Sequence, residues 1–224
     1  MMQPPTSVEE LLERGRSLAG LTLGALAARS HTAVPEDLRR AKGWVGALFE
    51  QCLGATAKSR AVPDFEALGI ELKTVPVTPA LVPLESTAVC QIDPIAIAGE
   101  SWETSYVRAK LAHVLFVALE VPPGARSVGD RRVSAVRLWS PAPDEEAALR
   151  ADFELFVREF FRRGRAAEIT GHLGVALQVR PKGRDATDMR AAYDAAGRPT
   201  RIGKMGFYLR PTFVRQIFAR ASEA

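Results

Sequence analysis

The sequence is poor in cysteine and histidine and contains no long hydrophobic run. Among 224 residues there are two cysteines, Cys52 and Cys90, and three scattered histidines. Two isolated cysteines indicate reduced thiols, and no C-x-x-C spacing or histidine cluster supports a zinc site. The longest apolar run, VLFVALEV from Val114, is far too short to span a membrane. The N-terminal residues also lack a signal-peptide pattern, so we expect a cytoplasmic protein that does not contact a membrane.

Positive charge is concentrated toward the C-terminus. The whole chain has a net charge of +4, but residues 151–224 hold 14 Lys and Arg against eight Asp and Glu. Residues 1–150 hold 16 Lys and Arg against 18 Asp and Glu. A basic C-terminal third favours a polyanionic partner such as DNA or RNA, although a solvated basic surface has the same composition.

The hydrophobic pattern changes period several times along the chain, which predicts a mixed α/β or α+β fold. The expected helices cover residues 7–18, 22–28, 42–53, 144–163, 186–197 and 211–221, with a short helix or turn at 101–111. The expected strands cover residues 69–77, 86–92, 112–121, 131–141, 173–183 and 205–209. Ser7 and Glu10 have the spacing of a capping box, and Asp144 is the expected N-cap of the long helix.

The stretch VPDFEALGIELKTVPV, from Val62 to Val77, combines an apolar strand with three charged residues. Glu71 and Lys73 lie two apart, so on a strand their side chains share one face. Gly69 allows the chain to turn back, which brings Asp64 toward Glu71. Two convergent carboxylates suit Mg²⁺, which activates water, and a neighbouring ammonium can position that water and a phosphate. This pattern predicts phosphodiester hydrolysis, but a surface Glu–Lys pair beside an unrelated Asp would match it by chance.

Glu50 is the one charged residue within the apolar helical segment GWVGALFEQCL. A partly buried carboxylate must be paired, protonated or bound to a metal. Glu50 is therefore a candidate third acid of the same site.

Five motifs together resemble one known family. KGWVGALFEQCLGA, PDFEALGIELKTVPV, WETSYVRAKL, LQVRPK and GFYL occur with the order and spacing of the MutH DNA mismatch-repair endonucleases. That family is a member of the PD-(D/E)xK restriction-endonuclease-like superfamily, and the resemblance spans about Ser7 to Phe218. It implies an α/β fold with a mixed central sheet flanked by helices, and two lobes forming a DNA-binding cleft. Residues 1–224 would form a single endonuclease domain, with an N-terminal catalytic lobe and a basic C-terminal recognition lobe.

The resemblance also implies an activity, a cofactor and partners. The expected enzyme nicks the unmethylated strand of double-stranded DNA at hemimethylated GATC sites in methyl-directed mismatch repair. It would use Mg²⁺, replaceable by Mn²⁺, and act as a monomer that MutL activates after MutS has found a mismatch. Two alternatives stay open: a restriction-type GATC endonuclease that cuts both strands, and a non-catalytic DNA-binding module.

Site residues follow from the matched motifs. The resemblance implies the catalytic residues Glu50, Asp64, Glu71, Lys73 and Lys110, of which Asp64, Glu71 and Glu50 would surround the metal. It implies the DNA-contacting residues Lys42, Gly43, Arg180, Pro181, Lys182 and Tyr208. Basic side chains at 180 and 182 suit the O6 and N7 acceptors of guanine, but they would equally suit phosphates. Tyr208 would test whether the N6 atom of adenine carries a methyl group, but a tyrosine at the end of a strand is also common in a core or at its rim.

Overall fold

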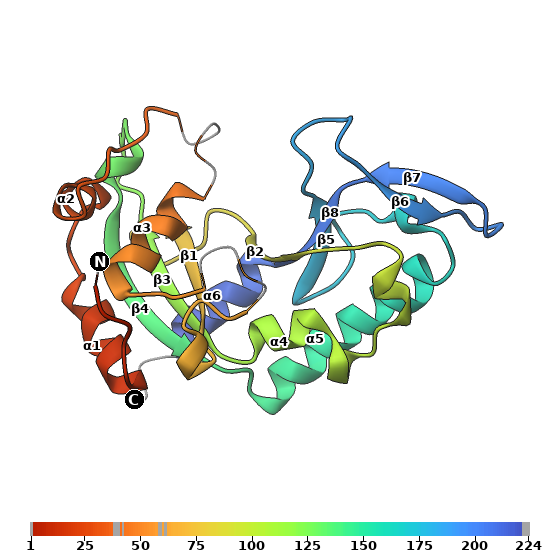
Figure 1. Ribbon diagram of the computed structural model, residues 1–224, viewed down its shortest axis with the longest axis horizontal. Coiled ribbons are helices and arrows are strands. Elements are labelled where there is room, and N and C mark those ends of the chain that lie inside the picture. The colour runs from red at the N-terminus through yellow and green to blue at the C-terminus, as the bar shows by residue number, and fades with distance from the viewer. Residues whose placement is uncertain (1, 38–40, 42, 58–59, 61, 221–224) are drawn as a thin grey trace. The chain divides into compact units, whose positions relative to one another are not determined.

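The computed structural model describes residues 2–37, 41, 43–57, 60 and 62–220 (Figure 1). The chain forms two compact units that interleave along the sequence. Unit 1 comprises Met1–Glu85, His113–Ser140 and Arg215–Ala224, and unit 2 comprises Ser86–Ala112 and Pro141–Val214. Across the described residues, no helix is long and apolar enough to cross a bilayer.

A mixed three-stranded sheet forms the centre of unit 1. Its order is β1-β3-β4, with β1 (Glu71–Val77) parallel to β3 (Val114–Glu120) and β3 antiparallel to β4 (Arg132–Trp139). The residues Val114–Leu119 are at most 1% exposed, as expected for a strand covered on both faces. β1 lies at an edge of this sheet, the position in which a strand tolerates a proline such as Pro76.

Helices pack on both faces of this sheet. The first three are α1 (Val8–Ser17), α2 (Leu23–Arg29) and α3 (Trp44–Leu53), and short 3₁₀ turns are η1 (Glu66–Leu68) and η4 (Val128–Asp130). Leu11, Leu26 and Phe49, one from each of the three helices, share a core cluster with Leu115 of β3. On the other face, the ring centroid of Phe116 lies 6.1 Å from that of Phe218, in the C-terminal part of α6 (Pro211–Ala219).

Local signals set the ends of the unit 1 helices. The Ser7 hydroxyl accepts a hydrogen bond from the Glu10 N–H, and the Thr22 hydroxyl accepts one from the Ala25 N–H, both at 3.1 Å. Gly54 ends α3 with φ +81°, a conformation that favours glycine. The predicted helix starts and the predicted stop at Gly54 are therefore confirmed.

Unit 2 contains an antiparallel sheet, a hairpin and a long helix. The sheet order is β2-β8-β5, built from β2 (Thr87–Gln91), β5 (Leu177–Pro181) and β8 (Met205–Leu209). The hairpin pairs β6 (Met189–Tyr193) with β7 (Pro199–Gly203). The helices are α4 (Tyr106–Leu111), α5 (Pro143–Phe156), a π-helical turn η5 (Val157–Phe161) and 3₁₀ turns η2 (Ala96–Gly99), η3 (Trp102–Thr104) and η6 (Ala166–Glu168).

The two faces of the β2-β8-β5 sheet differ in character. Phe207 of β8 packs on α5, with its ring centroid 5.9 Å from Phe153 and 6.0 Å from Phe156. Side chains alternate along a strand, so the next residue, Tyr208, points to the opposite face. Gln178 of β5 is directly opposite Tyr208 in the ladder. One face therefore completes the core of unit 2, and the other carries polar and aromatic side chains.

A buried carboxylate fixes the start of β5. Asp152 of α5 is 5% exposed and accepts hydrogen bonds from three successive backbone N–H groups. The donors are Val175, Ala176 and Leu177, at 2.9, 2.6 and 2.8 Å. Asp152 thereby ties the strand that carries Arg180 to the helix behind it.

The mixed α/β prediction is confirmed, but two local predictions are wrong. Residues 186–197 are not a helix, because Asp194 accepts hydrogen bonds from the Ala196 and Arg198 N–H groups, both at 2.9 Å, and closes a hairpin turn. Asp144 is not the N-cap of α5. Ala142 takes that position, with Pro143 in the first turn and Glu145 accepting a hydrogen bond from the Ala142 N–H at 3.0 Å.

We predict that Asp152→Ala lowers the free energy of unfolding by roughly 3 kcal/mol, because it leaves several buried N–H donors without an acceptor. Denaturant unfolding followed by circular dichroism measures this loss. The matched control is Glu154→Ala on the same helix, a half-buried residue paired with Arg150, which should cost less than about 1 kcal/mol. Equal losses in the two variants would contradict the anchoring role of Asp152.

Candidate active site

An ion pair on β1 forms the centre of the candidate site. The Lys73 Nζ lies 2.6 Å from Glu71 Oε1, and the two side chains are 15% and 6% exposed. Strand alternation places both side chains on one face, as the sequence predicts. A pair this strongly screened from water holds its ammonium in a defined position.

A tight reversal brings Asp64 to the same strand. Phe65 and Ile70 form an antiparallel bridge around η1, and Gly69 takes φ +67° in the turn between them. The Leu72 N–H donates a hydrogen bond of 2.8 Å to Asp64 Oδ2. The predicted return of Asp64 toward β1 is therefore observed, and the edge position of β1 leaves the Leu72 N–H available for this bond.

Glu50 adds a third carboxylate from α3, which packs on β1. Burial raises the pKa of Glu50 above its ordinary value, and the negative charges of Asp64 and Glu71 raise it further. The ammonium of Lys73 acts in the opposite direction. Glu50, Asp64, Glu71 and Lys73 thus share one electrostatic environment in unit 1.

The donor chemistry fits a magnesium ion held by two carboxylates. Asp64 and Glu71 offer hard oxygen ligands at adjacent positions, and Mg²⁺ commonly takes one or two protein carboxylates with water and phosphate completing its shell. The repulsion that raises the pKa of Glu50 is the kind that a bound cation relieves. Within the part of the chain that the structure describes, no group of three or more His, Cys, Asp or Glu side chains is arranged to hold a metal. The geometry therefore favours Asp64 and Glu71 as ligands, with Glu50 beside them.

The other predicted site residues lie in both units. Gly43 is the N-cap of α3 in unit 1, with φ +93°, whereas Lys42 lies outside the described residues. Lys110 belongs to α4 of unit 2, and its Nζ lies 5.4 Å from the ring centroid of Tyr106. Glu50 and its neighbours belong to unit 1, so the predicted catalytic residues are divided between the two units.

Three of the predicted DNA-contacting residues of unit 2, Arg180, Lys182 and Tyr208, lie on the polar side of its sheet. Arg180 and Pro181 end β5, and Lys182 follows them. The Lys182 Nζ lies 5.3 Å from the ring centroid of Tyr208 on β8. Gly206 makes room for this arrangement, because a Cβ there would lie 2.8 Å from the Cδ of Lys182.

Sequence reasoning missed two members of this group, Ser86 and Gln178. The Ser86 hydroxyl accepts hydrogen bonds from Gln178 at 2.6 Å and from Arg180 at 2.9 Å. Gln178 could have been found, because it lies two residues before Arg180 on a predicted strand and so shares its face. Ser86, more than ninety residues away, left no such signal.

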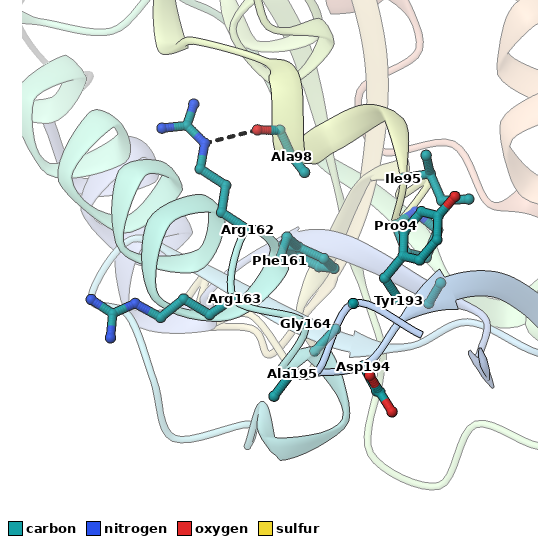
Figure 2. Close-up of a pocket in the computed structure, with 13 residues that line it drawn as sticks. Pro94, Ile95, Ala98, Phe161, Arg162, Arg163, Gly164, Tyr193, Asp194 and Ala195 are labelled. Carbon is teal, nitrogen blue, oxygen red and sulfur yellow. Dashed lines mark hydrogen bonds between the residues drawn. The ribbon is translucent and has the colours of Figure 1, made fainter. Parts of the chain in front are cut away.

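Unit 2 also contains a hollow of about 400 Å³ whose lining differs from the predicted site residues (Figure 2). Among the described residues that line it, none belongs to the predicted catalytic or DNA-contacting sets. It forms where the hairpin turn at Asp194 approaches Gly164, whose missing Cβ would otherwise collide with the Asp194 carbonyl oxygen. Ile95 and Tyr193, both exposed, stand on its rim. We attribute this hollow to the packing of the hairpin against the end of η5.

The mixed α/β fold and the acid–lysine group match the class of restriction-endonuclease-like nucleases. Comparisons with known proteins narrow that class. The family model described as DNA mismatch repair enzyme MutH matches residues 53–152. The DNA mismatch repair protein MutH of Vibrio cholerae serotype O1 (strain M66-2) is 45% identical over 222 residues, covering 98% of this chain and 99% of the relative. The same-named protein of Salmonella paratyphi B is 43% identical, covering 98% and 94%.

The chain belongs to the MutH family of DNA mismatch repair enzymes. The family resemblance inferred from the five motifs is therefore confirmed. The protein is a DNA endonuclease, a hydrolase acting on DNA, with a role in DNA mismatch repair.

We predict that Glu50→Gln stabilises the protein at neutral pH when no divalent cation is present. The pKa of Glu50 is raised in the folded chain, so the folded chain holds the Glu50 proton more tightly than the unfolded chain does. The stability that this proton contributes is complete below about pH 4.5 and is lost as the pH rises through the folded pKa. Because glutamine does not titrate, the difference in unfolding free energy between variant and parent should grow in the variant's favour above pH 4.5 and then level off. Denaturant titrations between pH 4.5 and pH 8 test this, with the exposed Glu13→Gln on α1 as control. A difference in unfolding free energy that shrinks as the pH rises would contradict the repulsion between Glu50 and the charges of Asp64 and Glu71.

Proposed function

We propose that the protein is a Mg²⁺-dependent endonuclease that nicks the unmethylated strand at hemimethylated GATC sites and is activated by MutL after MutS has found a mismatch. The observation that carries the proposal is the convergence of Asp64 with the Glu71–Lys73 pair on β1 of unit 1. The match of this chain to MutH proteins over nearly its whole length supports it.

Asp64 and Glu71 would hold the magnesium ion in this proposal. The ion supplies Lewis acidity, which lowers the pKa of a bound water and neutralises charge that develops on the phosphodiester. Lys73, held 2.6 Å from Glu71, positions the attacking water and the scissile phosphate. Glu50 is the accessory acid, and its raised pKa suits it to holding a proton close to the reacting groups. Lys110 of unit 2 contributes the positive charge through which the enzyme senses bound DNA.

Recognition belongs to the polar face of the β2-β8-β5 sheet. Arg180 and Lys182 present donors suited to the O6 and N7 acceptors of guanine, with Pro181 shaping the loop between them. Tyr208, over whose ring Lys182 lies, would contact the adenine N6 position and sense its methylation. Lys42 and Gly43 would lie against the DNA backbone at the start of α3.

We predict that the protein with Mg²⁺ and MutL cuts a duplex carrying one hemimethylated GATC site only on its unmethylated strand. The duplex, labelled separately on each strand, is resolved on a denaturing gel with and without MutL, and with Mn²⁺ replacing Mg²⁺. Glu71→Ala, which removes a proposed metal ligand and the partner of Lys73, should lower the rate at least about a thousandfold. Glu66→Ala, an exposed residue of η1, is the matched control and should leave the rate unchanged.

Other outcomes of this experiment would point to other functions. Cutting of both strands would indicate a restriction-type enzyme. DNA binding without any cut, under every condition, would indicate a non-catalytic module.

We also predict that Mg²⁺ raises the unfolding temperature through Asp64 and Glu71. At a hundred times its dissociation constant, a ligand that binds only the folded chain stabilises it by about 2.7 kcal/mol. Differential scanning calorimetry of the DNA-free protein, with and without Mg²⁺, measures this gain. Asp64→Asn and Glu71→Gln should abolish the gain, whereas Glu66→Gln should retain it. A gain that persists in both site variants would place the cation elsewhere.

A further inference from the structure

Arg180 belongs to a hydrogen-bond network with Gln178 and Ser86. Ser86 lies outside the five family motifs. Ser86 Oγ accepts one hydrogen bond from Gln178 Nε2 at 2.6 Å and a second from Arg180 NH1 at 2.9 Å. Gln178 is 5% exposed, whereas Arg180 is exposed. The network therefore connects an exposed guanidinium, through a half-buried hydroxyl, to a buried amide.

The strand register explains why these groups meet. Gln178 of β5 and Ala88 of β2 both lie opposite Tyr208 of β8, so the three form one row across the sheet. Arg180 lies two residues after Gln178 on the same face, and Ser86 lies just before β2. Because Phe207 and the rest of the other face pack on α5, this network lies on the face that also carries Tyr208.

The second observation concerns the neighbouring cation. Lys182 also has a partner in the DNA-free chain, because its Nζ lies 5.3 Å from the Tyr208 ring centroid. A Cβ at position 206 would lie 2.7 Å from the Cys90 carbonyl oxygen and 2.8 Å from the Lys182 side chain. Glycine at 206 thus leaves a channel for the stem of Lys182. Arg180 and Lys182 therefore both contact neighbouring side chains in the DNA-free chain.

We propose that Ser86 is a positioning residue for sequence specificity, which orients the guanidinium of Arg180 and is itself held by Gln178. This inference rests on the proposed reading of guanine by Arg180. A guanidinium has five N–H donors, so the bond to Ser86 leaves enough of them for a two-point contact with guanine O6 and N7. Long side chains lose conformational freedom on binding, and an arginine oriented in advance loses less of it.

The serine hydroxyl suits this role because it has two acceptor lone pairs, and both are used here. Alanine at 86 would remove the acceptor from Arg180 and from the buried amide of Gln178 together. Threonine would keep the oxygen and is therefore the conservative replacement. Ser134→Ala, which removes the hydroxyl that donates to the Ala118 carbonyl in unit 1, is a matched control away from the network.

The first test compares cleavage of two duplexes by the full-length protein with Mg²⁺ and MutL. One duplex carries GATC, and the other carries 7-deazaguanine in place of its guanine, which removes the N7 acceptor. The readout is the ratio of kcat/KM for the two duplexes. Ser86→Ala should reduce this ratio roughly tenfold, the loss expected for one hydrogen bond to a charged group, mainly through the GATC duplex. Ser86→Thr and Ser134→Ala should keep the ratio of the parent, and an unchanged ratio in Ser86→Ala would overturn the proposal.

The second test does not depend on the DNA sequence that the enzyme reads. The guanidinium ¹⁵N–¹H resonances of Arg180 in the DNA-free protein should be resolved in the parent and in Ser86→Thr, and averaged by rotation in Ser86→Ala. Resonances unchanged in Ser86→Ala would overturn the positioning role itself. A parent that cleaves both duplexes equally would overturn the proposed reading of guanine, and the specificity role of Ser86 with it. The two failures are therefore distinguishable.

Discussion

The structure of the candidate site depends on holding three carboxylates close to one ammonium. Lys73 compensates Glu71 at 2.6 Å, but the charges of Asp64 and Glu71 still raise the pKa of Glu50. Such crowding is unfavourable by itself and persists only where the surrounding structure enforces it. Here the enforcement comes from a central strand, β3, that is buried on both faces and pairs along the whole of β1.

The two units use the same device to place their functional strands, namely an aspartate that accepts backbone N–H groups. In unit 1, Asp64 accepts from Leu72 and so lies beside the Glu71–Lys73 pair. In unit 2, Asp152 accepts from the three residues that open β5 and so fixes the strand carrying Arg180. A charged acceptor forms stronger hydrogen bonds than a neutral one, which suits it to holding a strand at the edge of its sheet, where one side has no neighbouring strand.

Most elements could be predicted from the sequence because their signals are local. The hydroxyl caps at Ser7 and Thr22 and the glycine stop at Gly54 lie within one helical turn of the backbone groups that they serve. The segment 186–197 was mispredicted for the opposite reason. Its alanines favour a helix, but the turn at Asp194 and the pairing of β6 with β7 outweigh that preference. Intrinsic helix propensity contributes little free energy compared with the hydrogen bonds that strand pairing supplies.

The sequence by itself determined that Glu71 and Lys73 share a face, because the alternation of a strand is a property of the backbone. The sequence also determined membership of the MutH family, because five of its motifs occur in order along the chain. Only the tertiary structure decided that Glu50 lies within the electrostatic influence of Asp64 and Glu71. It also decided that Ser86 accepts hydrogen bonds from Gln178 and Arg180. These contacts join distant segments, and a chain fixes such distances only when its sheets and helices pack.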